Sequence, residues 1–420
     1  MPPRHRARLL YPTGACGTTG AMRCHHWTRL CAAALSALFL LLAGPANAAD
    51  AYKPAFRTLG ELTGEPALRL DINVWYPGIR APRELSYTPW TLYAARNGRP
   101  AEGRFPLLLL SHATPGTRFS YHDTAARLAA RGFVVAAPAH ARDSMHNMDD
   151  LFTWAQLENR VKELTGTIDV LLADKELSAS IDPARIGVLG FGTGGAAALL
   201  LGGALPDCAP WGQYCARAGA GDAYCNPWVR GKIDAICAGF PLTRSLADQR
   251  VKAVASVAPG YGLLFGPSSF RHFYPPLLLV VAGAEKVDRP EHHAGAIARL
   301  PGLKATVLEL PAADTGALMA PCPPSIAAEL PELCTSVSAE MRSALGRRLD
   351  AALADFFLRH LGSAVNVPHI PPPPDLTPPA PEKPAPAAPA KTKKRRTRPG
   401  RNPSGRGGSP LRLAFCSATC

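Results

Sequence analysis

Apolar runs and amphipathic runs alternate along the middle of the chain. Near-continuous apolar runs predict strands that are covered on both faces of a sheet, whereas apolar residues at helical spacing predict amphipathic helices. The strands are predicted at 68–77, 105–112, 133–140, 185–190, 251–259, 275–283 and 303–311. The helices are predicted at 122–132, 152–174, 194–202 and 339–361. This repeated alternation predicts the α/β class, with a doubly wound and mostly parallel sheet.

Three segments depart from this pattern and suggest the domain organisation. Residues 203–245 are irregular and rich in Gly and Cys, so they are predicted to form an inserted cap. Residues 1–48 form a leader, and residues 368–420 form a Pro-rich basic tail. The α/β domain is therefore predicted to span residues 49–367.

The leader has the features of a secretory signal. Basic residues such as Arg23 precede the apolar run "LCAAALSALFLLLAG", and "ANA" at 46–48 follows. The run is short for a membrane span. The coding start is either Met1 or Met22, and an uncleaved anchor is the alternative to cleavage. We expect a mature chain that begins near Ala49 and a secreted or periplasmic protein.

The charge of the chain is concentrated at its ends. The formal net charge is +14, but the central part is close to neutral and the excess lies in the leader and the tail. A segment such as "KTKKRRTRPGRNPSGRGG" cannot bury enough apolar surface to fold, so the tail is predicted to be disordered. It is either a solvated linker or an adhesive segment for an anionic envelope polymer or lipid headgroups. A nucleic-acid partner is not expected for an exported chain.

Cysteine usage agrees with export. Three of the 11 cysteines lie in the leader, and the other eight occur as local pairs, which is typical of an oxidising compartment. We predict a disulfide between Cys322 and Cys334. The pairing among four further cysteines stays open: Cys208, Cys215, Cys225 and Cys237. No C-x-x-C motif or histidine cluster indicates a metal site, and no cofactor is expected.

A glycine-rich turn at 190–195, "GFGTGG", is the main candidate for chemistry. It matches G-x-G-x-x-G, the dinucleotide fingerprint, which normally occupies the first βα turn of a fold. Here at least three strands precede it, so a dinucleotide-binding oxidoreductase is the weakest interpretation. The turn also matches G-x-S-x-G, a nucleophile elbow on a central strand, with Gly192 in place of the serine.

The wider chain resembles the α/β-hydrolase superfamily, in the branch of predicted dienelactone hydrolases and platelet-activating-factor acetylhydrolases. The similar stretches include "FPLLLLSHATPGTR", "AARLAARGFVVAAPAH", "ARIGVLGFGTGG", "ADQRVKAVASVAPGYGLLFGP" and "LMAPCPP", in family order. The resemblance covers roughly residues 68–362. It implies an α/β-hydrolase-type sheet and a carboxylic-ester hydrolase with a Ser/Asp/His triad.

The triad positions themselves are substituted. By resemblance, the nucleophile position holds Gly192, the acid position holds Lys286 and the histidine position holds Thr315. None of these side chains fills the role that the triad requires at its position. Glu285 and Asp288 flank the acid position.

Backbone donors of an oxyanion-type hole do not depend on these side chains. The resemblance places such N–H groups at Thr193 and near Ala113 or Thr114. We therefore expect an exported pseudo-hydrolase that binds a small ester or carboxylate, or serves as a scaffold. The alternative is an active ester hydrolase, similar to dienelactone hydrolase, with an atypical site.

Overall fold

A computed structural model of the chain describes residues 52–62, 69–239 and 244–363. Its centre is a ten-stranded sheet with the order β10-β9-β8-β7-β5-β6-β2-β1-β4-β3. The strands are β1 (Lys53–Leu62), β2 (Arg69–Gly78), β3 (Arg83–Tyr87), β4 (Trp90–Arg96), β5 (Phe105–Ser111), β6 (Val134–Pro138), β7 (Ile181–Phe191), β8 (Val251–Val257), β9 (Leu277–Ala282) and β10 (Ala305–Leu310).

The sheet is mostly parallel. Strands β6, β5, β7, β8, β9 and β10 pair in parallel, and β1 also pairs in parallel with β4. Strand β2 is antiparallel to β1 and β6, and β3 is antiparallel to β4. The expected doubly wound, mostly parallel sheet is therefore confirmed.

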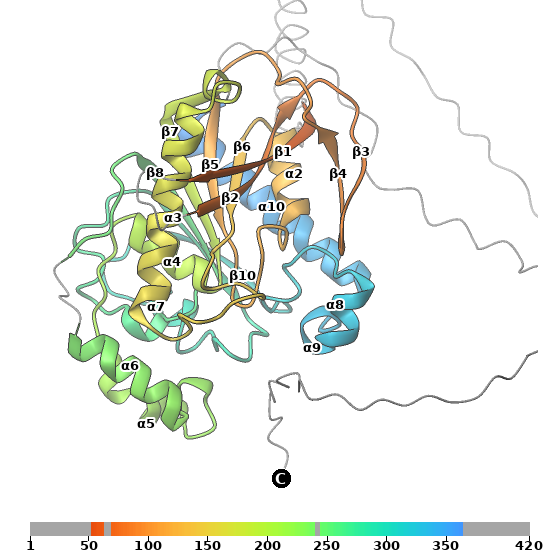
Figure 1. Ribbon diagram of the computed structural model, residues 1–420. Helices are drawn as coiled ribbons and strands as arrows, with labels where there is room; N and C mark the ends of the chain where they lie inside the picture. The colour runs from red at the N-terminus through yellow and green to blue at the C-terminus, as the bar shows by residue number, and fades with distance from the viewer. Residues whose placement is uncertain (1–51, 63–68, 240–243, 364–420) are drawn as a thin grey trace, which may run out of the picture. The chain divides into compact units, whose positions relative to one another are not determined.

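Helices cover both faces of the sheet (Figure 1). They are α2 (His122–Ala130), α3 (Trp154–Ala173), α4 (Thr193–Leu201), α5 (Tyr214–Ala218), α6 (Pro227–Gly239), α7 (Ala294–Ala298), α8 (Pro324–Glu329), α9 (Pro331–Cys334) and α10 (Ala339–Leu361). Short 3-10 helices lie at Ser178–Ser180, Trp211–Gln213, Ala223–Cys225 and Gly262–Leu264. Among the described helices, none has the length and apolar character that crossing a membrane requires.

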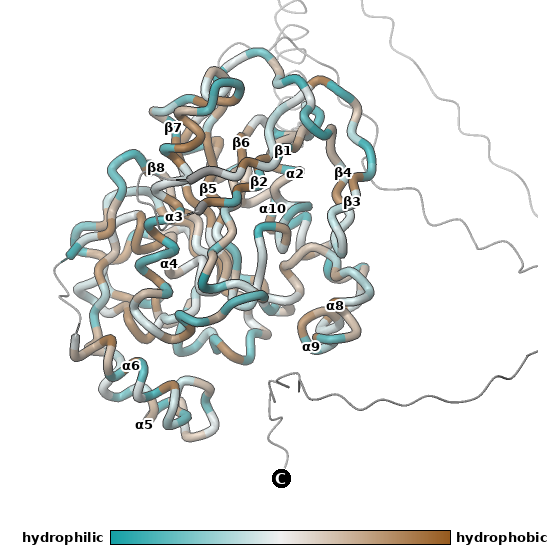
Figure 2. Tube along the Cα trace, viewed as in Figure 1, coloured by the Kyte–Doolittle hydropathy of each residue, from teal (hydrophilic) through white to brown (hydrophobic). Residues whose placement is uncertain are grey.

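Side chains that alternate along the central strands pack into two apolar clusters. Leu107 packs in the cluster that contains α3 and α4, whereas Leu108 packs in the one that contains α2 and α10. Successive strand residues point to opposite faces, so a strand in a sheet that is covered on both faces is apolar at nearly every position. All nine residues of α4 are buried, which explains its Ala- and Leu-rich sequence. Figure 2 shows hydrophobic residues concentrated along these inner strands.

The segment between α4 and β8 is the predicted Cys-rich insertion, and it contains α5 and α6 (green in Figure 1). Disulfides join Cys208 to Cys237 and Cys215 to Cys225, which resolves the pairing left open by the sequence. The predicted disulfide between Cys322 and Cys334 is confirmed; it links the chain just before α8 to the end of α9.

Candidate active site

The turn after β7 holds Gly192 in a backbone conformation that favours glycine. Its φ is 54° and its ψ is −122°, and its N–H donates to the Val257 carbonyl at 2.9 Å. A Cβ at Gly190 would lie 1.9 Å from the Gly194 carbonyl oxygen, and a Cβ at Gly194 would lie 2.2 Å from the Ser111 carbonyl oxygen. Two of the flanking glycines are therefore required by the close approach of backbone to backbone.

Gly192 differs from these two glycines because space for a small side chain is present. A Cβ there would lie 3.0 Å from the Ala113 Cβ, which is tight but needs a shift of only a few tenths of an ångström. A non-glycine residue in this conformation would be strained by about 1–3 kcal/mol. Gly192 avoids that strain, and it leaves the turn without a nucleophile.

The predicted oxyanion donors lie on two sides of this turn. Thr193 begins α4, where backbone N–H groups have no partner within the helix. Ala113 and Thr114 follow β5, and Ala113 is the residue that a side chain at position 192 would meet. The structure therefore brings Ala113 beside the elbow, and the N-terminus of α4 adds a positive dipole end there.

A buried polar network holds the loop after β5. Thr114 Oγ1 donates to both carboxylate oxygens of Asp143, at 2.9 and 3.0 Å, and accepts from Arg160 at 3.0 Å. Arg160 is fully buried and also donates to Asp143 at 2.6 Å and to the His112 carbonyl at 2.5 Å. Burial would raise the pKa of Asp143, but Arg160 and the hydrogen bond from Gln156 outweigh it and lower that pKa.

Ser111, His140 and Glu163 form a second arrangement beneath the loop. Ser111 Oγ lies 2.8 Å from His140 Nε2, and His140 Nδ1 lies 2.5 Å from Glu163. This order of groups resembles a Ser-His-carboxylate relay. All three residues are at most 3% exposed, so a substrate cannot reach them in this structure.

The protonation of the pair also opposes a catalytic role for Ser111. Burial raises the pKa of Glu163 to about 8 and lowers the pKa of His140. With Glu163 protonated, its O–H would donate to Nδ1, and the ring proton of His140 would lie on Nε2 and face Ser111. Nε2 then cannot accept the serine proton, and Arg160 donates to Ser111 Oγ at 3.2 Å. These contacts make the arrangement a support for the loop.

Thr315, at the predicted histidine position, contacts a carboxylate. Its Oγ1 donates to Glu285 at 2.6 Å, and its N–H donates to the same oxygen at 2.8 Å. The other oxygen of Glu285 accepts the N–H groups of Lys286 and Val287, each at 3.0 Å. The Lys286 side chain, assigned to the acid position from the sequence, is exposed and lies outside these contacts. In the structure, Glu285 is the acidic partner of Thr315.

Asp288 forms a further acidic group near the elbow. A Cβ at Gly260 would lie 2.9 Å from its carboxylate, and the Gly260 N–H donates to the Gly192 carbonyl at 3.0 Å. Burial, with a smaller contribution from the charge of Glu285, raises the pKa of Asp288 to about 7, although the hydrogen bond from Tyr224 opposes the shift. In the sequence Asp288 only flanks the acid position, and its burial depends on contacts that the folded chain makes.

Comparison with known proteins agrees with this geometry. The model of the "Dienelactone hydrolase family" matches residues 93–209, which include the loop after β5 and the elbow. The matched segment is therefore similar to the dienelactone hydrolase family, and it lies in a mostly parallel sheet of the α/β class. This segment ends before Glu285, Asp288 and Thr315, so the likeness does not extend to the acid and histidine positions.

Among solved structures, the chain is similar to a ferulic acid esterase from Streptomyces cinnamoneus. The identity is 21% and the TM-score is 0.49, with 76% of this chain and 92% of that chain covered. No curated protein matches the sequence.

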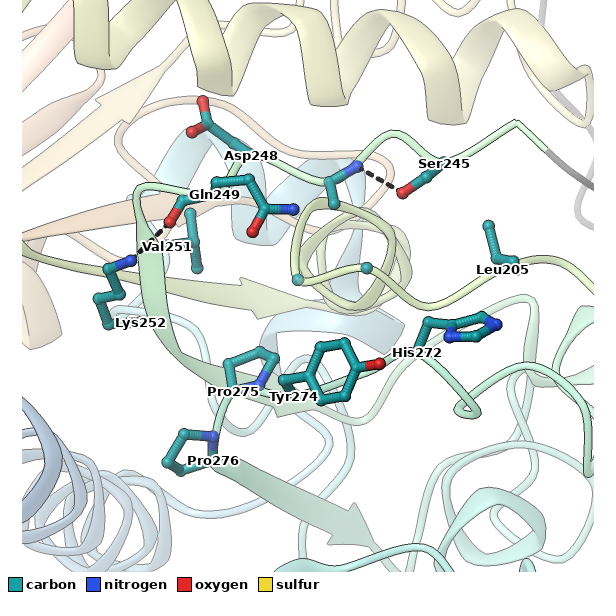
Figure 3. Close-up of a pocket in the computed structure, with 13 residues that line it drawn as sticks. Leu205, Ser245, Asp248, Gln249, Val251, Lys252, His272, Tyr274, Pro275 and Pro276 are labelled. Carbon is teal, nitrogen blue, oxygen red and sulfur yellow. Dashed lines mark hydrogen bonds between the residues drawn. The ribbon is translucent and has the colours of Figure 1, made fainter.

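A pocket lies near the start of β8, at the end of that strand away from the elbow. Figure 3 shows the residues that line it. It is lined by residues at the end of α4 and the start of β8, including Gly202, Asp248 and Val251, and by Tyr274 and Pro276 before β9. Strand β8 runs from this pocket to Val257 at the elbow, so the two places lie at opposite ends of the strand. None of the site residues predicted from the sequence lines it.

Proposed function

We propose that this α/β-hydrolase is an exported, non-catalytic protein that binds a small ester or carboxylate at its elbow. The observation that carries the proposal is Gly192. It lies in an elbow with backbone geometry suited to a nucleophile, but it has no side chain that could attack a carbonyl carbon.

The remaining groups support binding and oppose turnover. Position 315 has a hydroxyl where the resemblance expects an imidazole, and this hydroxyl donates its hydrogen bond to the Glu285 carboxylate. An alcohol is a poor base at neutral pH, so the side chain at position 315 cannot take a proton from an attacking water or serine. The backbone donors near Ala113 and at Thr193 need no triad and can hold a carbonyl oxygen.

Export is part of the same proposal. The three disulfides in the described residues are compatible with an extracellular location. The leader, with its cleavage point near Ala49, and the basic tail lie outside the described residues. We propose that the tail adheres to an anionic envelope polymer or to lipid headgroups.

The alternative, an active ester hydrolase, has one specific observation in its favour: the contacts of Ser111 with His140 and Glu163. An opening of the loop after β5 would be needed to expose that serine.

Hydrolysis of p-nitrophenyl butyrate by wild-type protein and by Ser111→Ala tests the two functions against each other. We expect both proteins to show the background rate. Wild-type turnover that disappears in Ser111→Ala would establish the alternative. Circular dichroism of both proteins verifies that the substitution leaves the fold intact.

A further inference from the structure

The pocket at the start of β8 is a cavity of about 500 Å³. This volume lies within the range of about 300–1,000 Å³ that is usual for small-molecule sites. Three segments form its walls: the end of α4 with Gly202, the start of β8 with Val251, and the stretch before β9 with Pro276. Its lining residues are separate from those of the elbow, so a function of this cavity does not rest on the function proposed above.

The Tyr274 ring is an exposed apolar wall of this cavity. Tyr274 is 83% exposed, the largest value among the large apolar side chains that are exposed in the described residues. The backbone on both sides of it is held in place. Phe273 packs against the core, and the Pro276 carbonyl accepts the Val254 N–H at 3.0 Å. Because Pro275 and Pro276 also restrict the chain, the ring is presented to solvent on a stiff segment.

The polar side chains around the ring are available to a ligand. In the parts of the chain that the structure describes, the side chains of Gln249, His272 and Tyr274 form no hydrogen bond or ion pair. The Ser245 Oγ accepts the Ala247 N–H at 3.2 Å and keeps its own O–H as a donor. Figure 3 shows the Gln249 amide and the Tyr274 ring pointing into the same space. Amide, imidazole and hydroxyl groups supply both donors and acceptors.

The charged groups of the cavity are largely engaged within the protein. The Asp248 carboxylate accepts from Arg250 at 2.7 and 2.9 Å, and Arg250 also donates to Asp169 at 2.6 Å. The Lys252 ammonium donates to the Gln249 carbonyl at 2.7 Å. A phosphate or carboxylate would therefore find no free guanidinium fork, which is the group that binds such anions most strongly.

We propose that this cavity binds an uncharged sugar residue of an oligosaccharide. A pyranose ring has an apolar face of C–H groups that suits an aromatic ring, and its hydroxyls both donate and accept hydrogen bonds. The exposed Tyr274 ring and the unengaged groups of Gln249, His272 and Ser245 meet these two requirements together. A wholly apolar ligand would instead take water from those polar groups and offer no partner in return.

NMR titration of the full chain with cellobiose and N,N′-diacetylchitobiose tests the proposal, with digalacturonate as an anionic disaccharide. We expect wild type to bind at least one of the neutral disaccharides, and to bind it more tightly than digalacturonate. Tyr274→Ala should weaken this binding about threefold to tenfold, the effect of losing one aromatic contact. Gln249→Ala should weaken it by a similar factor through loss of a hydrogen bond.

Tyr93→Ala is the matched control. Tyr93 is also an exposed tyrosine (42%), but it lies on β4, far from β8 in the strand order. Its loss should leave sugar binding unchanged. Tyr274→Ala and Tyr93→Ala should both keep the thermal unfolding midpoint of wild type, because substitution of an exposed side chain has little effect on stability.

Three results would overturn the proposal. The first is that wild type binds neither neutral disaccharide. The second is that Tyr274→Ala binds the sugar as tightly as wild type, which would mean that the sugar is bound elsewhere. The third is tighter binding of digalacturonate than of both neutral disaccharides, which would show that Lys252 selects an anion.

Discussion

At the scale of the residue, a position can lack the catalytic group and still have the local geometry that the group would need. Gly192 keeps the backbone turn and removes the nucleophile, and Thr315 keeps a hydrogen bond to an acid and removes the base. The carboxylate that contacts Thr315 is that of Glu285, and the side chain of Lys286 has no part in this contact. In the proposed non-catalytic protein, the residues at positions 192 and 315 account for the absence of turnover.

The resemblance assigns the acid position to Lys286, whereas the structure places the Glu285 carboxylate against Thr315, and this difference has a physical cause. The strand before this loop can be located from its apolar run, but a loop of several residues does not reveal which side chain turns toward Thr315. Only the folded loop shows that Glu285 does so, while Lys286 points to solvent. The glycine positions could be predicted, because a tight turn between backbone segments admits few residues.

Asp288 should make stability depend on pH. Its folded pKa of about 7 lies above its ordinary value of 3.8, because burial disfavours the carboxylate. The folded state therefore keeps a proton that the unfolded chain releases. Between about pH 4 and 7 wild type should lose stability relative to Asp288→Asn as the pH rises, and the difference should level off above pH 7.

Urea unfolding of both proteins across this range measures the effect. Asparagine can still accept the Tyr224 hydrogen bond, so the variant is expected to fold. Parallel dependence of the two unfolding free energies on pH would show that Asp288 does not carry the raised pKa.

At the scale of the element, helix α3 connects the loop after β5 to the body of the protein. Arg160 on α3 reaches Ser111, the His112 carbonyl, Thr114 and Asp143 at once. Its removal would leave the buried Asp143 carboxylate without a cation. We expect Arg160→Ala to lower the free energy of unfolding by about 3–5 kcal/mol, the cost of breaking a buried ion pair.

Arg250→Ala is the control for this prediction. Arg250 pairs with Asp169 and Asp248 but is about one-third exposed (35%), so its loss should cost about 0–1 kcal/mol. Equal losses in denaturant unfolding for the two variants would contradict the role given to Arg160. Periodicity predicted α3 itself, but not that one arginine on it would be fully buried, because that depends on contacts across the sequence.

Predictability also differs among strands. The helix over 339–361 was predicted with the bounds it has, and the inner strands were predicted to within a few residues. Strands β1, β3 and β4 were not predicted. In β4 buried and exposed residues mostly alternate and β3 is largely exposed, so neither has the apolar run of a strand covered on both faces.

At the scale of the whole molecule, the elbow lies at the ends of central strands where several segments far apart in sequence converge. The turn after β7, the loop after β5 and the loop after β9 meet there, as open α/β sheets allow at the carboxyl ends of parallel strands. The α/β class and its sheet type followed from the order of apolar and amphipathic runs. The contacts of the Cys-rich insertion did not, because irregular sequence has no period from which to infer them.

The tail should be dispensable for folding. Its Pro-rich, basic composition cannot support a packed core, and residues 371–420 lie outside the described part of the chain. We expect a chain that ends at residue 370 to have the thermal unfolding midpoint of the full mature protein. A chain that ends before Phe356 should be less stable, because it loses Phe356 and Phe357, which are both buried in α10. A lower midpoint for the chain ending at 370 would show that the tail contributes to the fold.

We propose that the site is inactive because positions 192 and 315 lack a nucleophile and a base. Labelling by a fluorophosphonate probe tests it most directly, on wild type, Gly192→Ser, Gly192→Ser/Thr315→His and the last variant with Glu285→Gln added. We predict no labelling of wild type or of the single variant, since position 315 holds no imidazole to act as the base for its serine. The double variant should be labelled, and loss of Glu285, which would orient the new histidine, should weaken that labelling. Labelling of wild-type protein, or equal labelling of the single and double variants, would contradict the account.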